Sequence, residues 1–203
     1  MTSPAPSAGL GFLPPWLVGE VVHAGSVVDL VVRRTGDLAR EEVQVLRGLL
    51  DAAFDGTFSD DDWHHTIGGL HVLALADGVI VSHAAVLQRT LVVGQQSLSV
   101  GYVEGVATRP DNRHRGHASR MMEVVGSIIA GDYDLGALST GCPDFYARLG
   151  WESWQGPTYV DAPDGRRRTA AEDDGVMVLR TDRSGDVDLT AELTCDWRSG
   201  DVW

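Results

Sequence analysis

Two stretches of this chain place hydrophobic residues three or four positions apart, which is the spacing of a helix with one buried face. In the first, Val43, Leu46 and Leu50 share a face, and Asp37 is the expected N-cap of a helix that runs to about Phe54. The second stretch has a longer stripe, formed by Ala118, Met121, Met122, Val125, Ile128 and Ile129. We therefore predict two amphipathic helices in different halves of the chain.

Other hydrophobic runs are rich in Val and are bounded by turn residues, which favours strands. The clearest signal is a hairpin in which Asp77-Gly78 joins residues 71–76 to residues 79–93, because Asp-Gly supplies the backbone twist of a tight turn. Further predicted strands cover residues 27–34, 95–108, 134–139, 151 onward and 176–179, and short helices cover 59–66 and 143–149. An antiparallel meander followed by a strand–loop–helix–strand crossover is typical of a single mixed α+β domain.

Three segments have the composition of irregular structure. Residues 1–20 contain four prolines and no basic residue ahead of their apolar stretch, so we interpret them as a flexible tail rather than a signal peptide. Residues 161–174 are polar and are predicted to form a long loop, and the last twenty residues are predicted to form an acidic tail. The single folded domain is accordingly expected at residues 21–203.

The overall composition is ordinary for a soluble globular protein and restricts the partners. Of 203 residues, 43% are hydrophobic and 22% are charged, and no run approaches the ~18 consecutive apolar residues of a membrane span. The formal net charge of -13 disfavours nucleic acid and anionic membranes and favours a polycationic ligand. Cys142 and Cys195 form no CxxC motif, so we expect two free thiols in a reducing cytoplasm. All 16 basic residues are Arg, a bias that suggests a bacterium with a GC-rich genome.

The segment Arg113-His114-Arg115-Gly116-His117-Ala118, at the start of the second long helix, fits the pattern R/Q-x-x-G-x-G/A. A glycine lets the backbone approach a ligand, and the first amides of a helix point outward without partners. These amides and the helix dipole favour a pyrophosphate, and Arg113 and Arg115 add positive charge in an otherwise acidic protein. The alternative is an ordinary solvated loop.

This loop resembles the coenzyme A loop of the GNAT acetyltransferases. A second run is similar to the FYxxxGF signature of the same superfamily, namely Asp144-Phe145-Tyr146-Ala147-Arg148-Leu149-Gly150-Trp151. The resemblance implies a GNAT fold, with a mixed, mostly antiparallel sheet whose central parallel strands splay apart, flanked by helices. It also implies acetyl-CoA as cosubstrate, with the pantetheine against the backbone of Gly105 and Val106 and the diphosphate on the amides of 113–118. Tyr146 would then donate a proton to the departing thiolate, and the alternative is a core aromatic residue.

A narrower resemblance, to the aminoglycoside 2'-N-acetyltransferases, covers nearly the whole chain after residue 27. It rests on Asp62-Trp63 with Gly68-Gly69, on 101–107, 136–139 and 156–158, and above all on the ending Cys195-Asp196-Trp197-Arg198-Ser199-Gly200-Asp201-Val202-Trp203. It implies a homodimer and a cationic aminoglycoside as acceptor. The acidic acceptor pocket that it implies consists of Asp62, Glu104, Ser139, Asp174, Asp201 and the terminal carboxylate of Trp203. Thr57 departs from the pattern, because the family is expected to carry an acid there.

Glu104 lies in the middle of a predicted strand, on the same face as Tyr102 and Val106, where an unpaired carboxylate is costly to bury. One interpretation is an ion pair with an arginine inside the sheet. The other is a base that takes a proton, through a water, from the acceptor ammonium, since only a neutral amine attacks a thioester. Asp62 is similarly ambiguous, because it completes a capping box with Ser59 and also fits the acceptor pocket.

Taken together, these features predict direct acetyl transfer from acetyl-CoA to the 2'-amine of an aminoglycoside in a ternary complex. No acyl-enzyme is expected, because neither cysteine has an evident His–acid pair. Three alternatives stay open: another amine acceptor (a polyamine, a peptide N-terminus or a kasugamycin-like aminoglycoside), a protein that sequesters the drug without catalysis, and a native role on cell-wall precursors or a self-made antibiotic. His64-His65 and His114 with His117 lack partners at ligand spacing, so no metal is expected.

Overall fold

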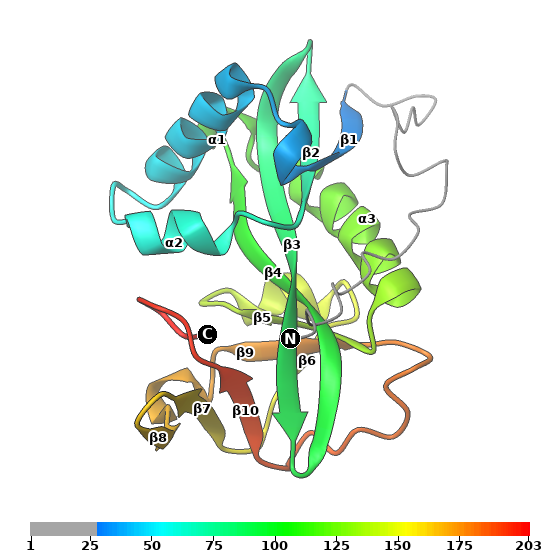
Figure 1. The fold of residues 1–203 in the computed structure, drawn as a ribbon. Helices are drawn as coiled ribbons and strands as arrows, with labels where there is room; N and C mark the ends of the chain where they lie inside the picture. The colour runs from blue at the N-terminus through cyan, green and yellow to red at the C-terminus, as the bar shows by residue number, and fades with distance from the viewer. Residues whose placement is uncertain (1–27) are drawn as a thin grey trace, which may run out of the picture.

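The computed structural model describes residues 28–203 as one sheet with helices packed on it (Figure 1). The strands are β1 (Asp29–Arg34), β2 (Leu70–Ala76), β3 (Val79–Val93), β4 (Gln96–Thr108), β5 (Leu135–Ser139), β6 (Glu152–Ser153), β7 (Thr158–Ala162), β8 (Gly165–Arg168), β9 (Val176–Arg180) and β10 (Leu193–Asp196). The helices are α1 (Arg40–Ala53), α2 (Asp60–His65), α3 (His117–Asp132) and α4 (Pro143–Ala147), with 3-10 turns η1 (Thr35–Asp37), η2 (Pro110–Asn112) and η3 (Ala170–Glu172). Hydrogen-bonded strands follow the order β6-β9-β5-β4-β3-β10-β7-β8, and β2 pairs with both β1 and β3 beside this path. None of the helices in the described range is long and apolar enough to span a membrane.

The two longest strands, β3 and β4, form the hairpin on which the sheet is assembled. β3 pairs with β2 along its first half and with β10 near its end, so it connects the end of the molecule that carries α1 and α2 to the end that carries β7 and β8 (Figure 1). The turn between β2 and β3 has a positive φ at both Asp77 and Gly78, 50° and 74°, as a tight hairpin turn requires. The hairpin predicted at this dipeptide is therefore confirmed.

Alternation of side chains along the strands divides the hydrophobic core between two faces of the sheet. On β2, Leu73 packs with Leu46 and Leu50 of α1, whereas Val72 and Ala74 belong to the cluster that includes α3. The buried residues of α3 include most of the predicted stripe, namely Met121, Met122, Val125, Ile128 and Ile129. α1 and α3 therefore cover opposite faces, and both also pack against β4.

β4 and β5 run parallel but stay paired over only three residues of each strand. Val100–Tyr102 of β4 face Leu135–Ala137 of β5, and no pairing between these two described strands continues beyond that point, although β4 extends to Thr108. The space between the strands opens into the cavity described below. The predicted fold class, an α+β sheet with splayed central parallel strands, is confirmed.

Helix α1 begins later than predicted. Asp37 belongs to η1, and the residue that precedes the helix is Ala39. The Ala39 N–H donates to the Glu42 carboxylate at 2.8 Å, so a side chain of the first turn satisfies this amide without a polar capping residue. The prediction of Asp37 as the N-cap is wrong, because Asp37 lies in the η1 turn and the helix begins only after Ala39.

The segment 161–174 is not a continuous loop. β8 pairs with the end of β7 in an antiparallel hairpin, and η3 follows it. The Arg166 guanidinium lies 3.9 Å from the centroid of the Tyr159 ring, and that of Arg168 lies 5.4 Å from it. All four residues of β8 are exposed, so this strand has no hydrophobic alternation from which it could have been predicted.

The last twenty residues are not an acidic tail. β10 lies between β3, to which it is antiparallel, and β7, to which it is parallel. Leu193 and Cys195 are buried, and Arg89 of β3 forms an ion pair with Asp196, with 2.9 Å between Nε and Oδ1. Likewise, the strand predicted from residue 151 onward is two strands, β6 and β7. The predicted tail at 1–20 and the predicted start of the first strand at Val27 lie outside the described residues. Within the described residues, the first strand, β1, begins at Asp29.

Candidate active site

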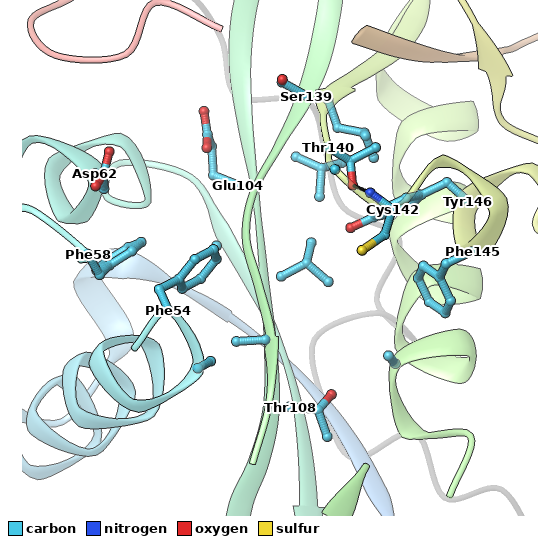
Figure 2. A pocket seen from close by; sticks show the side chains of 18 of the residues that line it. Phe54, Phe58, Asp62, Glu104, Thr108, Ser139, Thr140, Cys142, Phe145 and Tyr146 are labelled. Carbon is cyan, nitrogen blue, oxygen red and sulfur yellow. Dashed lines mark hydrogen bonds between the residues drawn. The ribbon is translucent and has the colours of Figure 1, made fainter. Parts of the chain in front are cut away.

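A cavity of about 910 Å³ opens where β4 and β5 separate. Figure 2 shows Phe54, Phe58 and Asp62 on one side of it, Ser139 and Tyr146 on the other, and β4 between them. Its lining residues come from the end of α1, α2, β4, the loop before α3, the first turn of α3, β5, the loop into α4, α4 and the residues after β10. The cavity therefore gathers segments from most of the described chain.

One end of the cavity is the N-terminus of helix α3. The helix begins after Gly116, whose φ of 79° lies in the left-handed region, and no side chain of the described residues caps it. Amides at such a terminus, together with the dipole of a 16-residue helix, attract an anion. All but one of the predicted cofactor residues line the cavity: Gly105, Val106, Arg113, His114, Gly116, His117 and Ala118. The exception, Arg115, is exposed and lies outside the lining.

Beside this end, strand β4 contains a bulge. Gly105 and Val106 together stand opposite the single residue Ala84 of β3. Gly105 has a φ of 57°, and a Cβ at this position would lie 2.9 Å from Thr66 Cγ2, so both the backbone angle and the space require glycine. The bulge interrupts the β3–β4 ladder next to Glu104, and the residues on both sides of Gly105 line the cavity.

Glu104 lines the cavity and is paired with Arg198, which follows β10. Arg198 Nη1 donates to Glu104 Oε1 at 2.5 Å, and the two side chains are 15% and 17% exposed, respectively. The main-chain oxygens of Asp201 and Trp203 accept from the same guanidinium at 2.7 and 2.9 Å. Burial raises the pKa of Glu104 above its ordinary value, and the charge of Arg198 opposes the shift. Glu104 thus has the arginine partner that one interpretation expected, although it comes from the C-terminal segment, and its carboxylate still lines the cavity.

Carboxylates gather at the end of the cavity that lies near α2. Asp62 and Asp201 line it, and Asp62 also completes the predicted capping box, because its carboxylate accepts the Ser59 N–H at 2.8 Å. The Ser139 hydroxyl, also in the lining, lies 3.4 Å from Glu172 Oε2. Burial raises the pKa of Glu172, and the charge of Asp201 adds to the shift. Mutual repulsion of these acids makes this end a favourable place for a cation.

Asp174 is exposed and does not line the cavity, in contrast to the expected pocket. The preceding Asp173 is engaged elsewhere, since its Oδ1 accepts the Thr158 N–H at 3.0 Å. Glu172, at the end of η3, instead reaches Ser139. Trp203 is buried in the lining, and its indole N–H donates to the Thr169 hydroxyl at 2.9 Å.

Tyr146 is on α4, and Figure 2 shows it on the same side of the cavity as Cys142 and Ser139. Burial raises the pKa of its phenol to about 12, Cys142 adds to the shift, and a hydrogen bond with Thr140 opposes it. The Phe145 ring packs edge-on against it, with 4.9 Å between centroids. The phenol therefore keeps its proton at neutral pH and can act as a donor.

The comparison with known proteins decides the family. Residues 34–154, more than half of the chain, match the family model described as an acetyltransferase (GNAT) domain. The chain belongs to the GNAT acetyltransferases. A curated relative, the aminoglycoside 2'-N-acetyltransferase of Mycolicibacterium fortuitum, is 42% identical over 189 residues, which cover 91% of this chain and 94% of the relative. Both resemblances expected from the sequence are confirmed.

Solved structures show the GNAT fold of the chain. The GNAT family N-acetyltransferase YhbS from Escherichia coli, solved in complex with CoA, matches with a TM-score of 0.60 at 16% sequence identity. The match covers 86% of this chain and 93% of the YhbS chain. A GNAT family acetyltransferase from Brucella melitensis, in complex with acetyl-CoA, has a TM-score of 0.54 at 13% identity, with 84% and 96% covered. The GCN5-related N-acetyltransferase from Kribbella flavida has a TM-score of 0.53 at 19% identity, and there the match covers 64% of this chain but spans only about a third, 34%, of the longer protein.

This GNAT acetyltransferase also has cavity residues that the sequence did not indicate as part of the site: Phe54, Phe58, His65, Cys142 and Arg198. His65 Nε2 lies 2.8 Å from the main-chain oxygen of Ser199, and burial, followed by the charge of Arg198, lowers the pKa of His65. This contact joins residues 134 positions apart, so no local pattern could have indicated it. Within residues 28–203, no three His, Cys, Asp or Glu side chains gather as a metal site would require.

Proposed function

We propose that this GNAT acetyltransferase transfers the acetyl group of acetyl-CoA to the 2'-amine of a cationic aminoglycoside. The observation that carries the proposal is the polarity of the cavity, which has the open N-terminus of α3 and Arg113 at one end and Asp62, Glu104 and Asp201 at the other. A phosphate-bearing donor suits the first end and a polycation suits the second. The relative from M. fortuitum, which is named for this reaction, supports the acceptor, and the neighbours solved with CoA or acetyl-CoA support the donor.

The residues of the donor end fit acetyl-CoA by their chemistry. The first amides of α3, at His117 and Ala118, would hold the diphosphate, with Arg113 adding charge. The main chain of Gly105 and Val106, which is not paired with β5, has hydrogen-bonding groups for the amides of the pantetheine arm. When bound, acetyl-CoA supplies an activated acyl group on sulfur.

We infer that two side chains move protons during the transfer. The Glu104 carboxylate accepts the proton that the acceptor ammonium must lose, directly or through a water, and its raised pKa makes it a better base than an exposed carboxylate. Tyr146, across the cavity, keeps its proton at neutral pH and donates it to the sulfur as the acyl–sulfur bond breaks. These roles agree with the assignment made from the sequence and stay predictions, which the variants below test.

We infer direct transfer rather than an acyl-enzyme. Cys195 is buried, and burial raises the pKa of its thiol to about 11, so it is protonated at neutral pH and is a poor nucleophile. Cys142 is exposed and lines the cavity, and its main-chain N–H donates to the Thr140 side-chain hydroxyl at 3.0 Å. Among the described residues, neither thiol is hydrogen-bonded to a histidine that could take its proton, which supports a ternary complex of donor, acceptor and enzyme.

A matched pair of aminoglycosides tests the proposed reaction. The two compounds differ only in an amine or a hydroxyl at the 2'-carbon, and the release of free CoA thiol is followed with each. We expect release with the amine and none with the hydroxyl. Release with neither, accompanied by tight drug binding in calorimetry, would establish a sequestering protein instead. Release with polyamines or peptides but not with the aminoglycoside would assign the enzyme to another amine.

The acidic end of the cavity predicts a specific effect on acceptor binding. Asp201→Asn should raise the acceptor KM about 3- to 10-fold with little change in kcat, because the charge attracts the ground state and the transition state alike. The effect should shrink at high ionic strength, since Asp201 is exposed and its charge is screened. Asp186→Asn, an exposed change of the same charge outside the cavity, is the control. An unchanged KM in Asp201→Asn would remove this residue from the site, and Asp174→Asn tests the predicted role of Asp174 in the same assay.

We further propose that the enzyme is a homodimer in the bacterial cytoplasm, as the family resemblance and the two free cysteines suggest. Sedimentation equilibrium should give twice the mass of one chain. A monomer at micromolar concentration would contradict the proposed dimer without affecting the proposed reaction.

A further inference from the structure

A line of hydrogen bonds runs beneath helix α1 from a surface turn to the bulge in the cavity wall. It begins at the Thr35 hydroxyl, which lies 2.8 Å from His71 Nε2. His71 Nδ1 lies 2.9 Å from His83 Nε2, and His83 Nδ1 lies 2.7 Å from the carbonyl oxygen of Gly105. His71 is on β2 and His83 is on β3, and their relative exposures are 1% and 0%. Neither histidine belongs to the lining of the cavity.

The chemistry of the last acceptor determines the direction of every bond in this line. The Gly105 carbonyl can only accept, so His83 carries its proton on Nδ1. A neutral imidazole has one N–H, so His83 Nε2 accepts from His71 Nδ1–H, and His71 Nε2 in turn accepts from the Thr35 hydroxyl. Thr35 Oγ1 is also an acceptor for the Gly68 N–H at 2.9 Å. The Gly69 carbonyl, at 3.4 Å, is a more distant acceptor for the same hydroxyl. With both histidines as neutral Nδ1–H tautomers, every donor of the line meets an acceptor at 2.9 Å or less.

Burial supports the neutral state of both rings. It lowers the pKa of His71 to about 4 and that of His83 to about 3, and the charge of His71 adds to the shift of His83. The line therefore does not carry protons to the substrate, because it ends on a carbonyl that cannot pass one on. Its physical effect is to hold that carbonyl in place.

The carbonyl in question belongs to the bulge, where the ladder between β3 and β4 is interrupted. A partly buried main-chain carbonyl at a break in the ladder is stabilised by another donor, and His83 supplies it. Glu104 and Val106 flank Gly105 and line the cavity, so a rotation of the Gly105 peptide would displace both. The atoms that would lie nearest to a Cβ at Gly105 are the apolar Thr66 Cγ2 and Leu50 Cδ2 and then the His83 ring, so the histidine packs against the bulge as well as bonding its carbonyl.

We propose that His83, with His71 and Thr35 behind it, is a positioning residue for acetyl transfer. It holds the Gly105 carbonyl and thereby sets the Glu104 carboxylate and the main-chain groups of Val106 relative to each other. The role of His83 rests on the proposed function, because Glu104 and Val106 are the groups that this function uses. The other end of the line binds Gly68, in the turn that follows α2, so the same bonds connect the helix of Asp62 to the bulge.

Two substitutions of His83 separate positioning from packing. His83→Leu keeps a buried side chain but leaves the Gly105 carbonyl without a donor, whereas the side-chain amide of His83→Asn can reach it from about the position of Nδ1. We expect His83→Leu to lower kcat about 10- to 100-fold with both KM values within about threefold of wild type, since a small misplacement of reacting groups has effects of this size. His83→Asn should recover most of that loss. The acceptor in the assay is whichever amine the wild-type enzyme acetylates.

Ser184→Ala is the control for stability. It removes a buried hydroxyl that bonds the Thr181 main chain at 2.7 and 2.8 Å and lies outside the lining of the cavity. If His83→Leu lost no more kcat than this variant, if His83→Asn showed no recovery, or if the loss lay in KM alone, the proposal would be overturned. Inactivity of the wild type would instead contradict the proposed function.

Histidine NMR of the wild-type protein gives a readout that needs neither activity nor a variant that folds. Nitrogen-15 spectra should show His71 and His83 as neutral Nδ1–H tautomers, with no titration between about pH 5 and 8. An Nε2–H tautomer at His83, or a midpoint within this range for either ring, would break the sequence of donors and acceptors and overturn the proposal whatever the kinetics.

Discussion

Tyr146→Phe should lower kcat roughly 10²- to 10³-fold and leave both KM values close to those of the wild type. The phenol is buried, and its pKa of about 12 keeps it protonated throughout the neutral range, so it is a proton donor at the pH of the assay. Phenylalanine keeps the ring and its contacts with Phe145 and Trp151, and removes only the hydroxyl. The thiolate then leaves without a proton, which affects the transition state and not the binding of either substrate.

The measurement is thiol release at saturating concentrations of both substrates, with the thermal unfolding midpoint as a check on the fold. Tyr133→Phe is the matched control, because Tyr133 is half-buried outside the cavity and burial raises its pKa too. A Tyr146→Phe enzyme with wild-type kcat would show that the hydroxyl does not protonate the leaving group. A loss that appears only in KM would assign the hydroxyl to substrate binding.

Glu104→Gln should lower kcat by about 10² or more, since the amide cannot take the proton that the ammonium loses. In the wild type the carboxylate is the active form, so kcat falls as the pH falls through the Glu104 pKa. Because burial raises that pKa above the ordinary 4.5, the loss begins at a higher pH than it would for an exposed glutamate. Glutamine removes this ionisation, so the remaining activity should lack that acidic limb.

The fold should survive Glu104→Gln, because Arg198 keeps its bonds to the main-chain oxygens of Asp201 and Trp203. Glu152→Gln is the control: it changes another Glu–Arg pair, with 2.8 Å between Arg180 Nε and Glu152 Oε1, outside the cavity. If both variants kept wild-type turnover, Glu104 would be an acceptor contact or a structural ion pair and another group would be the base. His65, neutral and in the same cavity, would then be the first candidate.

The features that could be predicted from the sequence are local. Asp77-Gly78 needs only two positive φ angles, and the stripe from Met121 to Ile129 needs only helical spacing. The capping box at Ser59 and Asp62 spans four residues. The open end of α3 follows from Gly116 and from the absence of a capping side chain among its described neighbours. In each case the physical requirement involves only residues that are close together in the sequence.

The features that could not be predicted depend on contacts between distant residues. The Arg198 partner of Glu104 lies 94 positions away, and the two histidines beneath α1 meet only because β2 and β3 pair in one register. Glu172 contacts Ser139 and Asp174 is exposed, an arrangement that depends on η3 and the β7–β8 hairpin, and β8 has no hydrophobic residue from which that hairpin could be predicted. The family resemblance predicted an acidic cavity, and the tertiary fold determined which acids lie at or near its lining.

The position of β10 has a consequence for how the enzyme matures. This strand pairs with β3 and β7, both of which precede it in the sequence. Because these pairings join residues far apart in the chain, β10 can add to the sheet only after β3 and β7 have formed. Arg198, Asp201 and Trp203 follow it, whereas the donor end is made from β4 and α3. We therefore expect newly made chains to gain the capacity to hold the nucleotide before they gain the capacity to hold the sugar.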